Sequence, residues 1–179
     1  MDKGGRKMDN VKGTNSEASM DSIQLVASLL ICHPEFSKIT LVSKDKAIIM
    51  EISVKEAPEP QLIEEGEQFI VDSLRLYHDI EYIRGAQFAF FYKDFTLHIY
   101  RDLATFSHGE VGLLLSLLKE KFGSIILSDD NRDADEDMLA TQAEMIDHRI
   151  RFLKENRIPE SMVGVREEGR VMVYDNDRL

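Results

Sequence analysis

The chain has 179 residues, with 33 acidic and 22 basic side chains, so its formal net charge at pH 7 is −11. A net negative charge opposes broad attraction to nucleic acid phosphates and to anionic membrane surfaces. The single cysteine excludes an intramolecular disulfide bond, and no apolar run approaches the length of a membrane-spanning helix. These properties predict a cytoplasmic protein with one folded core, without membrane association, for which nucleic acid is an unfavoured partner.

The first segment, residues 1–19, is predominantly polar, and Val11 is its one large aliphatic residue. Such a segment cannot bury enough apolar surface to offset the entropy lost on ordering. We therefore expect a disordered N-terminal arm over residues 1–19.

Residues 20–128 combine helical and strand patterns, as is typical of an α+β core domain. The expected elements are helices over residues 21–32, 62–77 and 111–122, hairpins over 38–54 and 87–101, and a short strand over 124–127. In the first strand of the second hairpin, apolar residues alternate onto both faces: Phe88 and Phe90 on one, Ala89 and Phe91 on the other. This pattern predicts a central strand that is covered on both sides.

Residues 129–179 predict a C-terminal helix over 135–156 and a hairpin over 162–174, packed on the core domain. A helix followed by a hairpin thus occurs three times, over residues 21–54, 60–101 and 135–174. This order predicts an α+β fold with a largely antiparallel sheet built from helix–hairpin units and about four helices packed against it.

The stretch TFSHGE places a hydroxyl, an imidazole and a carboxylate together at Ser107, His108 and Glu110. Ser107 and Glu110 have the S-x-x-E spacing of a capping box, in which each side chain bonds the other residue's backbone N–H. No G-x-S-x-G elbow is present to expose the serine as a nucleophile. We interpret the stretch as the start of a helix and not as a catalytic site.

Metal and cofactor signatures are weak. The acidic loop matches alternate positions of a calcium-binding EF-hand loop at Asp129, Asn131, Asp133, Asp135 and Asp137. The match fails at Ala134, where the loop needs glycine, and at Ala140, where it needs a bidentate glutamate. The histidines lack zinc-site spacing, and no glycine-rich phosphate loop occurs. We expect no metal and no cofactor.

One alternative function is a binding protein or an enzyme for a small anionic ligand. His98 and Tyr100 share one face of the strand over 95–101, which ends at Arg101 and Asp102. Together with Arg84, these side chains form a candidate ligand pocket at a strand end.

A second alternative is an RNA-binding accessory factor. Its candidate surface is a basic group near the end of the last helix and on the final hairpin: Arg149, Arg151, Lys154, Arg157, Arg166 and Arg170. No RNP-type aromatic motif accompanies these cations. Cations near a helix C-terminus also complement the helix dipole, which is a sufficient structural reason for them.

The final strand predicts an interface. Val171 and Val173 occupy one face and Met172 and Tyr174 the other, so neither face reads as solvated. A second copy of the chain would cover the apolar side chains and the unpaired edge. The sequence therefore favours a non-catalytic interaction or regulatory module that self-associates as a homodimer, with a further protein partner left open. Enzymatic activity is the less favoured reading.

Overall fold

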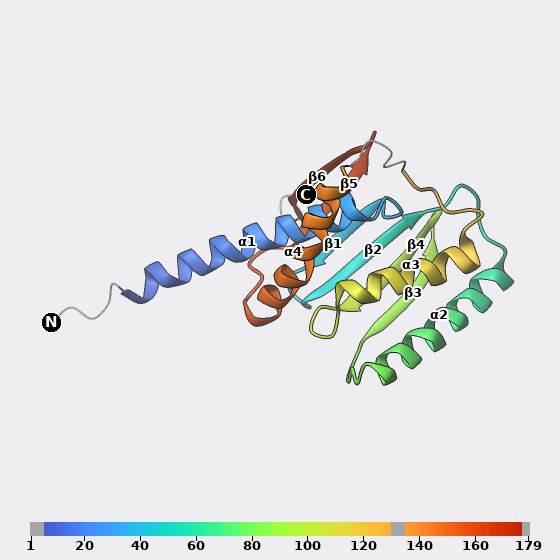
Figure 1. Cartoon of the computed structure of the whole chain (residues 1–179), viewed down its shortest axis with the longest axis horizontal. Helices are drawn as coiled ribbons and strands as arrows, with labels where there is room; N and C mark the ends of the chain where they lie inside the picture. The colour runs from blue at the N-terminus through green and yellow to red at the C-terminus, as the bar shows by residue number, and fades with distance from the viewer. Residues whose placement is uncertain (1–5, 130–134, 177–179) are drawn as a thin grey trace.

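The computed structural model describes residues 6–129 and 135–176, with side chains from Ser19 onward, as four helices against a six-stranded antiparallel sheet (Figure 1). In chain order the elements are α1 (Arg6–Cys32), β1 (Lys38–Val42), β2 (Ala47–Ser53), α2 (Pro60–Ile80), β3 (Phe88–Lys93), β4 (Thr96–Asp102), α3 (His108–Phe122), α4 (Glu136–Glu155), β5 (Met162–Glu167) and β6 (Arg170–Asp175). The predicted α+β fold built from helix–hairpin units is confirmed.

Two of the hairpins, β3–β4 and β5–β6, close with tight turns. Asp94 and Phe95 both have positive φ, at 49° and 57°, as do Glu168 and Gly169, at 50° and 76°. Two successive left-handed residues form the two-residue turn whose twist matches that of the flanking strands. The turn after β3 lies one residue later than Lys93-Asp94, the position that the sequence suggested.

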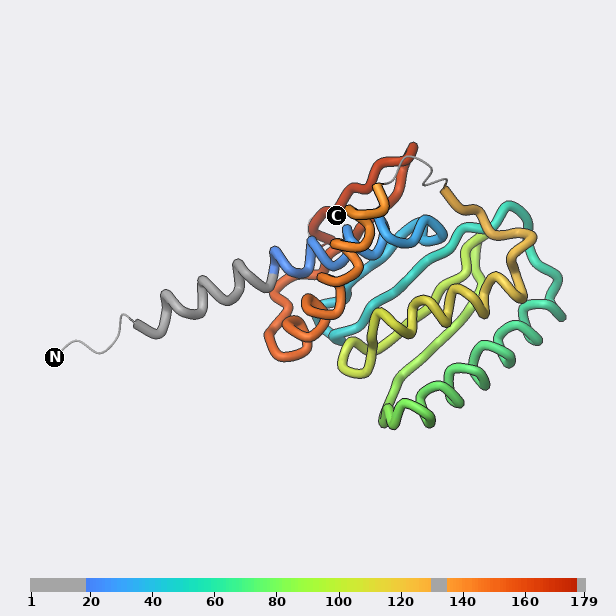
Figure 2. Tube along the Cα trace, viewed as in Figure 1, coloured from blue at the N-terminus to red at the C-terminus, as the bar shows by residue number. Residues whose placement is uncertain are grey.

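The strand order in the sheet is β3-β4-β2-β1-β5-β6, and every neighbouring pair is antiparallel. Because β5 pairs with β1, the C-terminal hairpin belongs to the same sheet as the strands of residues 38–102. It also lies beside α1, the blue segment in Figure 2. Residues 124–127 form a single antiparallel bridge, Val54 to Ile126, where a short strand was expected.

The described helices all lie on one face of the sheet (Figure 1). The core row of this face crosses all six strands through Phe90, Ile99, Met50, Ile39, Gly164 and Val173. Helix α1 packs directly over Gly164, where an added Cβ would lie 2.7 Å from Leu30 Cδ1. Helix α3 reaches the same face, where the Phe122 ring lies 5.8 Å from that of Phe90. Helix α4 packs on α1.

Two expectations are affected by this arrangement. Strand β3 ends the sheet and Phe91 is 48% exposed, so the prediction of a central strand covered on both sides is wrong. Helix α1 begins at Arg6, within the segment 1–19; residues 1–5 lie outside the described part of the chain, and the disordered arm stays a prediction. No helix of the described residues is long and apolar enough to cross a membrane.

Candidate functional site

The sheet face opposite the helices, here called the open face, is defined by two parallel rows of side chains. The first row runs Phe91, His98, Glu51, Lys38, Val165 and Met172; the second runs Ala89, Tyr100, Ile49, Thr40, Val163 and Tyr174. Within residues 6–129 and 135–176, no helix covers these rows. Phe91, Met172 and Tyr174 are 48%, 44% and 39% exposed, so the flanks of the open face present large apolar groups to solvent.

The centre of the first row is polar and paired. Glu51 lies between His98, whose Nδ1 is 3.5 Å from Oε1, and Lys38, whose Nζ is 3.7 Å from Oε2. The His98 ring stacks on Phe91 with centroids 4.6 Å apart and planes 5° from parallel. The open face therefore has a charged, internally paired centre between exposed apolar flanks.

On the opposite, helix-covered face, Arg101 and Glu110 form a fully buried ion pair. The guanidinium donates to both Glu110 carboxylate oxygens, and its remaining N–H groups bond Asp102 and Thr105 and the Gln87 carbonyl. All its donors therefore have partners, which is the condition under which a buried charge is tolerated.

This cluster joins three helix and strand ends. Glu110 comes from the first turn of α3, Arg101 from β4, and His78, also bonded to Glu110, from the last turn of α2. Burial alone would raise the pKa of Asp102, but hydrogen bonds from Gln87 and Thr105 and the charge of Arg101 hold it below its usual value. Because Arg101 is fully buried, no ligand can reach it. The cluster instead holds the ends of α2, β4 and α3 together.

The predicted ligand residues are not brought together. His98 and Tyr100 lie on the open face, while Arg101 points into the helix side of the sheet and is used internally. Asp102 accepts from Thr105, and Arg84 lies exposed in the loop before β3. Strand alternation accounts for this, since residues 98 and 101 differ by an odd number of positions.

The predicted helix start is half confirmed. Ser107 is the N-cap of α3, and its Oγ accepts from the Glu110 N–H at 3.4 Å. The expected return contact from the Glu110 carboxylate is absent, because that side chain turns inward to Arg101 and His78. The neighbouring His108 does not serve Ser107 as a base; its Nε2 lies 2.8 Å from His33 Nε2 at the end of α1.

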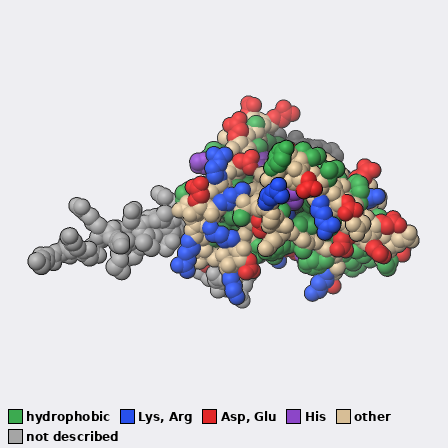
Figure 3. All heavy atoms as spheres, turned by 90° about the horizontal axis from the view of Figure 1, so that it is seen from below, with side chains coloured by type: hydrophobic (Ala, Val, Ile, Leu, Met, Phe, Trp, Pro, Cys, Tyr) green, Lys and Arg blue, Asp and Glu red, His purple; other side chains and the backbone are tan. Residues whose placement is uncertain are grey.

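Two members of the predicted basic group act inside the fold. Arg149 is buried and donates to Ser28 Oγ at 2.6 Å. Arg166 donates to the Leu30, Phe36 and His33 carbonyls at and just beyond the C-terminal end of α1. Arg151, Lys154, Arg157 and Arg170 remain exposed. Lys and Arg side chains gather on the α4 side of Figure 3, and Asp and Glu on the side where α2 begins.

The predicted interface residues are divided between two environments. Val171 and Val173 face the helices and pack against the core, while Met172 and Tyr174 lie on the open face. Since β5 joins the hairpin to the chain's own sheet, one edge of β6 is already paired. The open face of β6, with Met172 and Tyr174, remains available for an interface.

In the acidic loop, Asn131 and Asp133 lie outside the described residues. Asp135 caps α4 by accepting from the Asp137 N–H. Among the described residues, no group of three His, Cys, Asp or Glu side chains is placed to hold a metal ion.

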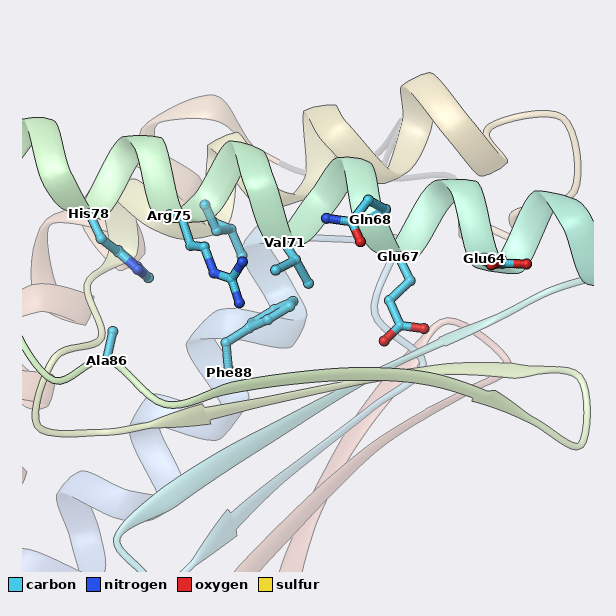
Figure 4. A pocket seen from close by; sticks show the side chains of 9 residues that line it. Glu64, Glu67, Gln68, Val71, Arg75, His78, Ala86 and Phe88 are labelled. Atoms are coloured by element: carbon cyan, nitrogen blue, oxygen red, sulfur yellow. The ribbon is translucent and has the colours of Figure 1, made fainter.

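One feature had no sequence signal. A groove of about 550 Å³ lies between α2 and the edge strand β3 (Figure 4). It is lined by Glu64, Glu67, Gln68, Val71, Leu74, Arg75, His78, Ala86 and Phe88. The groove depends on the position of α2 above β3 and on β3 being the edge strand, and the local sequence pattern predicts neither of these.

Comparisons of the chain with protein-family models, with curated proteins and with solved structures find no match.

Proposed function

We propose that the chain is a non-catalytic cytoplasmic interaction module that forms a homodimer by stacking the open faces of two sheets. The observation that carries the proposal is the composition of the open face, whose apolar flanks are solvent-exposed at Phe91, Met172 and Tyr174. Covering exposed apolar side chains removes them from water, and stacked sheets pack about 10 Å apart face to face.

The order of side chains supports a second copy as the occupant. A two-fold axis between the sheets, parallel to the strands and midway between β2 and β1, reverses each row onto itself. Glu51 then faces the partner's Lys38, and Phe91 faces the partner's Met172. In the second row Ala89 faces the partner's Tyr174, so a small side chain meets a large one. A two-fold interface requires this kind of self-complementarity.

An axis perpendicular to the strands is less favourable. It would move one row onto the other and place the charged Glu51 against the partner's Ile49. Burying a carboxylate against an aliphatic side chain has a large desolvation cost. Charge pairing therefore selects the axis that runs along the strands.

The first test is sedimentation of the full chain at ~100 μM, well above a micromolar dissociation constant. We expect a dimer that Met172→Glu converts to monomer, because a charge would be buried on the flank. Leu76→Glu is the matched control, since Leu76 is 61% exposed but lies on α2. A wild-type chain that stays monomeric would overturn the proposal.

The second test addresses the geometry of the pair. Lys38→Glu alone and Glu51→Lys alone each place like charges across the axis, so both variants should be monomeric. Mixed together, they should form a heterodimer, because the introduced glutamate would face the introduced lysine and the remaining Glu51 would face the remaining Lys38 across the interface. The repulsion within each chain persists in the mixture, so recovery would report the contact between chains. A mixture that stays monomeric would exclude this axis.

A further inference from the structure

The α2–β3 groove lies beside an unpaired strand edge. Strand β3 ends the sheet, and Figure 4 views it with α2 above and no described element outside it. The two-residue turn at Asp94 and Phe95 makes Lys93 and Thr96 the closing hydrogen-bonded pair. By alternation, the backbone N–H and C=O groups of Phe88, Phe90 and Tyr92 point away from β4, toward the open edge.

The groove has an apolar middle and a charge at each end. Val71, Leu74 and Phe88 form the apolar part. Glu64 and Glu67 come from the early turns of α2, and Arg75 comes from near its end, beside the start of β3 (Figure 4). The one ion pair of Arg75 among the described residues is an exposed contact with Asp72 at 3.9 Å, so its charge remains largely available.

These charges define a direction. Helix α2 and strand β3 run antiparallel, so the acidic end of the groove lies toward the end of β3 and Arg75 toward its start (Figure 4). A strand added antiparallel to β3 would enter at the acidic end and leave at Arg75. Its side chains opposite Phe88, Phe90 and Tyr92 would point to the α2 side, because directly opposed residues share a face.

We infer that this groove binds an extended peptide segment of another protein as an antiparallel strand added to β3. The favoured segment carries a basic residue toward its N-terminal end, an apolar residue two positions later and an acidic residue two positions after that. Strand addition supplies affinity through the backbone, and side-chain pockets supply selectivity. The inference goes beyond self-association, because it uses the β3 edge and the helix side of the sheet.

The test is selection of a random peptide phage library on the full-length chain. Selected peptides should share the basic, apolar, acidic order at alternate positions. The triple variant Glu64→Lys/Glu67→Lys/Arg75→Glu exchanges the charges of the groove and should select the reverse order. No enriched sequence, or an order unchanged by the exchange, would overturn the inference.

A synthetic copy of the enriched peptide then measures affinity by fluorescence anisotropy. Val71→Asp should weaken binding at least about tenfold, and Leu76→Asp on the outer surface of α2 should change it less than about twofold. Equal losses in both variants would overturn the assignment of the groove. Sedimentation of the same samples reports the dimer separately, so failure of one proposal is distinguishable from failure of the other. A peptide that dissociates the dimer would show that the second copy occupies this edge, and it would overturn the assignment of the groove to another protein.

Discussion

At the scale of single residues, the Arg101–Glu110 pair is the clearest case of a buried charge kept by complete pairing. Arg101→Met should lower the free energy of unfolding by about 3–5 kcal/mol, because Glu110 would remain buried without its partner. Arg101→Met/Glu110→Leu should lower it by much less than the sum of the single changes. Urea denaturation at one protein concentration measures the free energy of unfolding of Arg101→Met, Glu110→Leu and the double variant. Additive losses would show that the two side chains act independently.

A second residue-scale prediction concerns pH. Desolvation, and then the nearby His108, lower the pKa of His33 to about 4 from its ordinary 6.5. Between these values the unfolded chain binds more protons at His33 than the folded chain does. The contribution of His33 to the free energy of unfolding is therefore fully present above pH 6.5 and is lost as the pH decreases toward 4. The full loss amounts to about 3 kcal/mol.

Thermal unfolding at a series of pH values tests this. His33→Gln should flatten the pH dependence of the melting temperature between pH 6.5 and 4. His148→Gln is the control, because His148 is exposed on α4. If His33→Gln keeps the wild-type slope, the acid sensitivity arises from other groups.

The same scale shows how far local pattern can reach. Ser107 was identified as a cap from its spacing, and the structure agrees. The inward turn of Glu110 was missed, because the capping pattern contains no information on burial. The signal lay in β4. Arg101 is an even number of positions from Leu97 and Ile99, so it lies on the same strand face and had to face the core, where a guanidinium needs an anionic partner.

At the scale of elements, the approach of α2 to α3 depends on Gly66. An added Cβ would lie 2.8 Å from Phe122 Cε2 and closer still to Cζ. Gly66→Ala should therefore destabilise the protein by about 1–3 kcal/mol through overpacking. Gly112→Ala is the opposite case, because nothing lies within 4 Å of its Cβ position on exposed α3 surface. It should stabilise by up to about 1 kcal/mol through helix propensity. Chemical denaturation compares the two variants, and equal effects would argue against close packing at Gly66.

Most elements were predictable because the spacing of their apolar residues distinguishes helix from strand within the segment itself. Strand β3 shows the limit: the alternation of its side chains was correct, but its place in the sheet was not. Apolar residues on both faces were taken to mean cover on both faces. Phe91 instead stacks on His98 on a face that no described helix covers. Local composition reports that a surface is apolar and does not report what covers it.

At the scale of the whole molecule, the strand order could not be read from the sequence. The pairing of β1 with β5 places Ile39 opposite Gly164, and the sequence of neither segment indicates that it pairs with the other. The separation of His98 from Arg101 follows from alternation alone, whereas the groove beside α2 requires knowing that β3 is an edge. Alternation could therefore place single side chains on one face or the other, but no local pattern could bring the groove residues together.

The pairing of β1 with β5 also has a consequence for the newly made chain on the ribosome. Helix α1 and β1 are synthesised before β2, β3 and β4, but Gly164 of β5, against which Val26 and Leu30 pack, is made only after all of them. Until then one side of β1 lacks its neighbouring strand and part of the apolar surface of α1 is bare. Such exposed edges are where nascent chains misassemble or recruit chaperones. This side of β1 is therefore completed only after strands β2 to β4 have been made, and a ribosome stalled before the β5–β6 hairpin would present an unfinished edge.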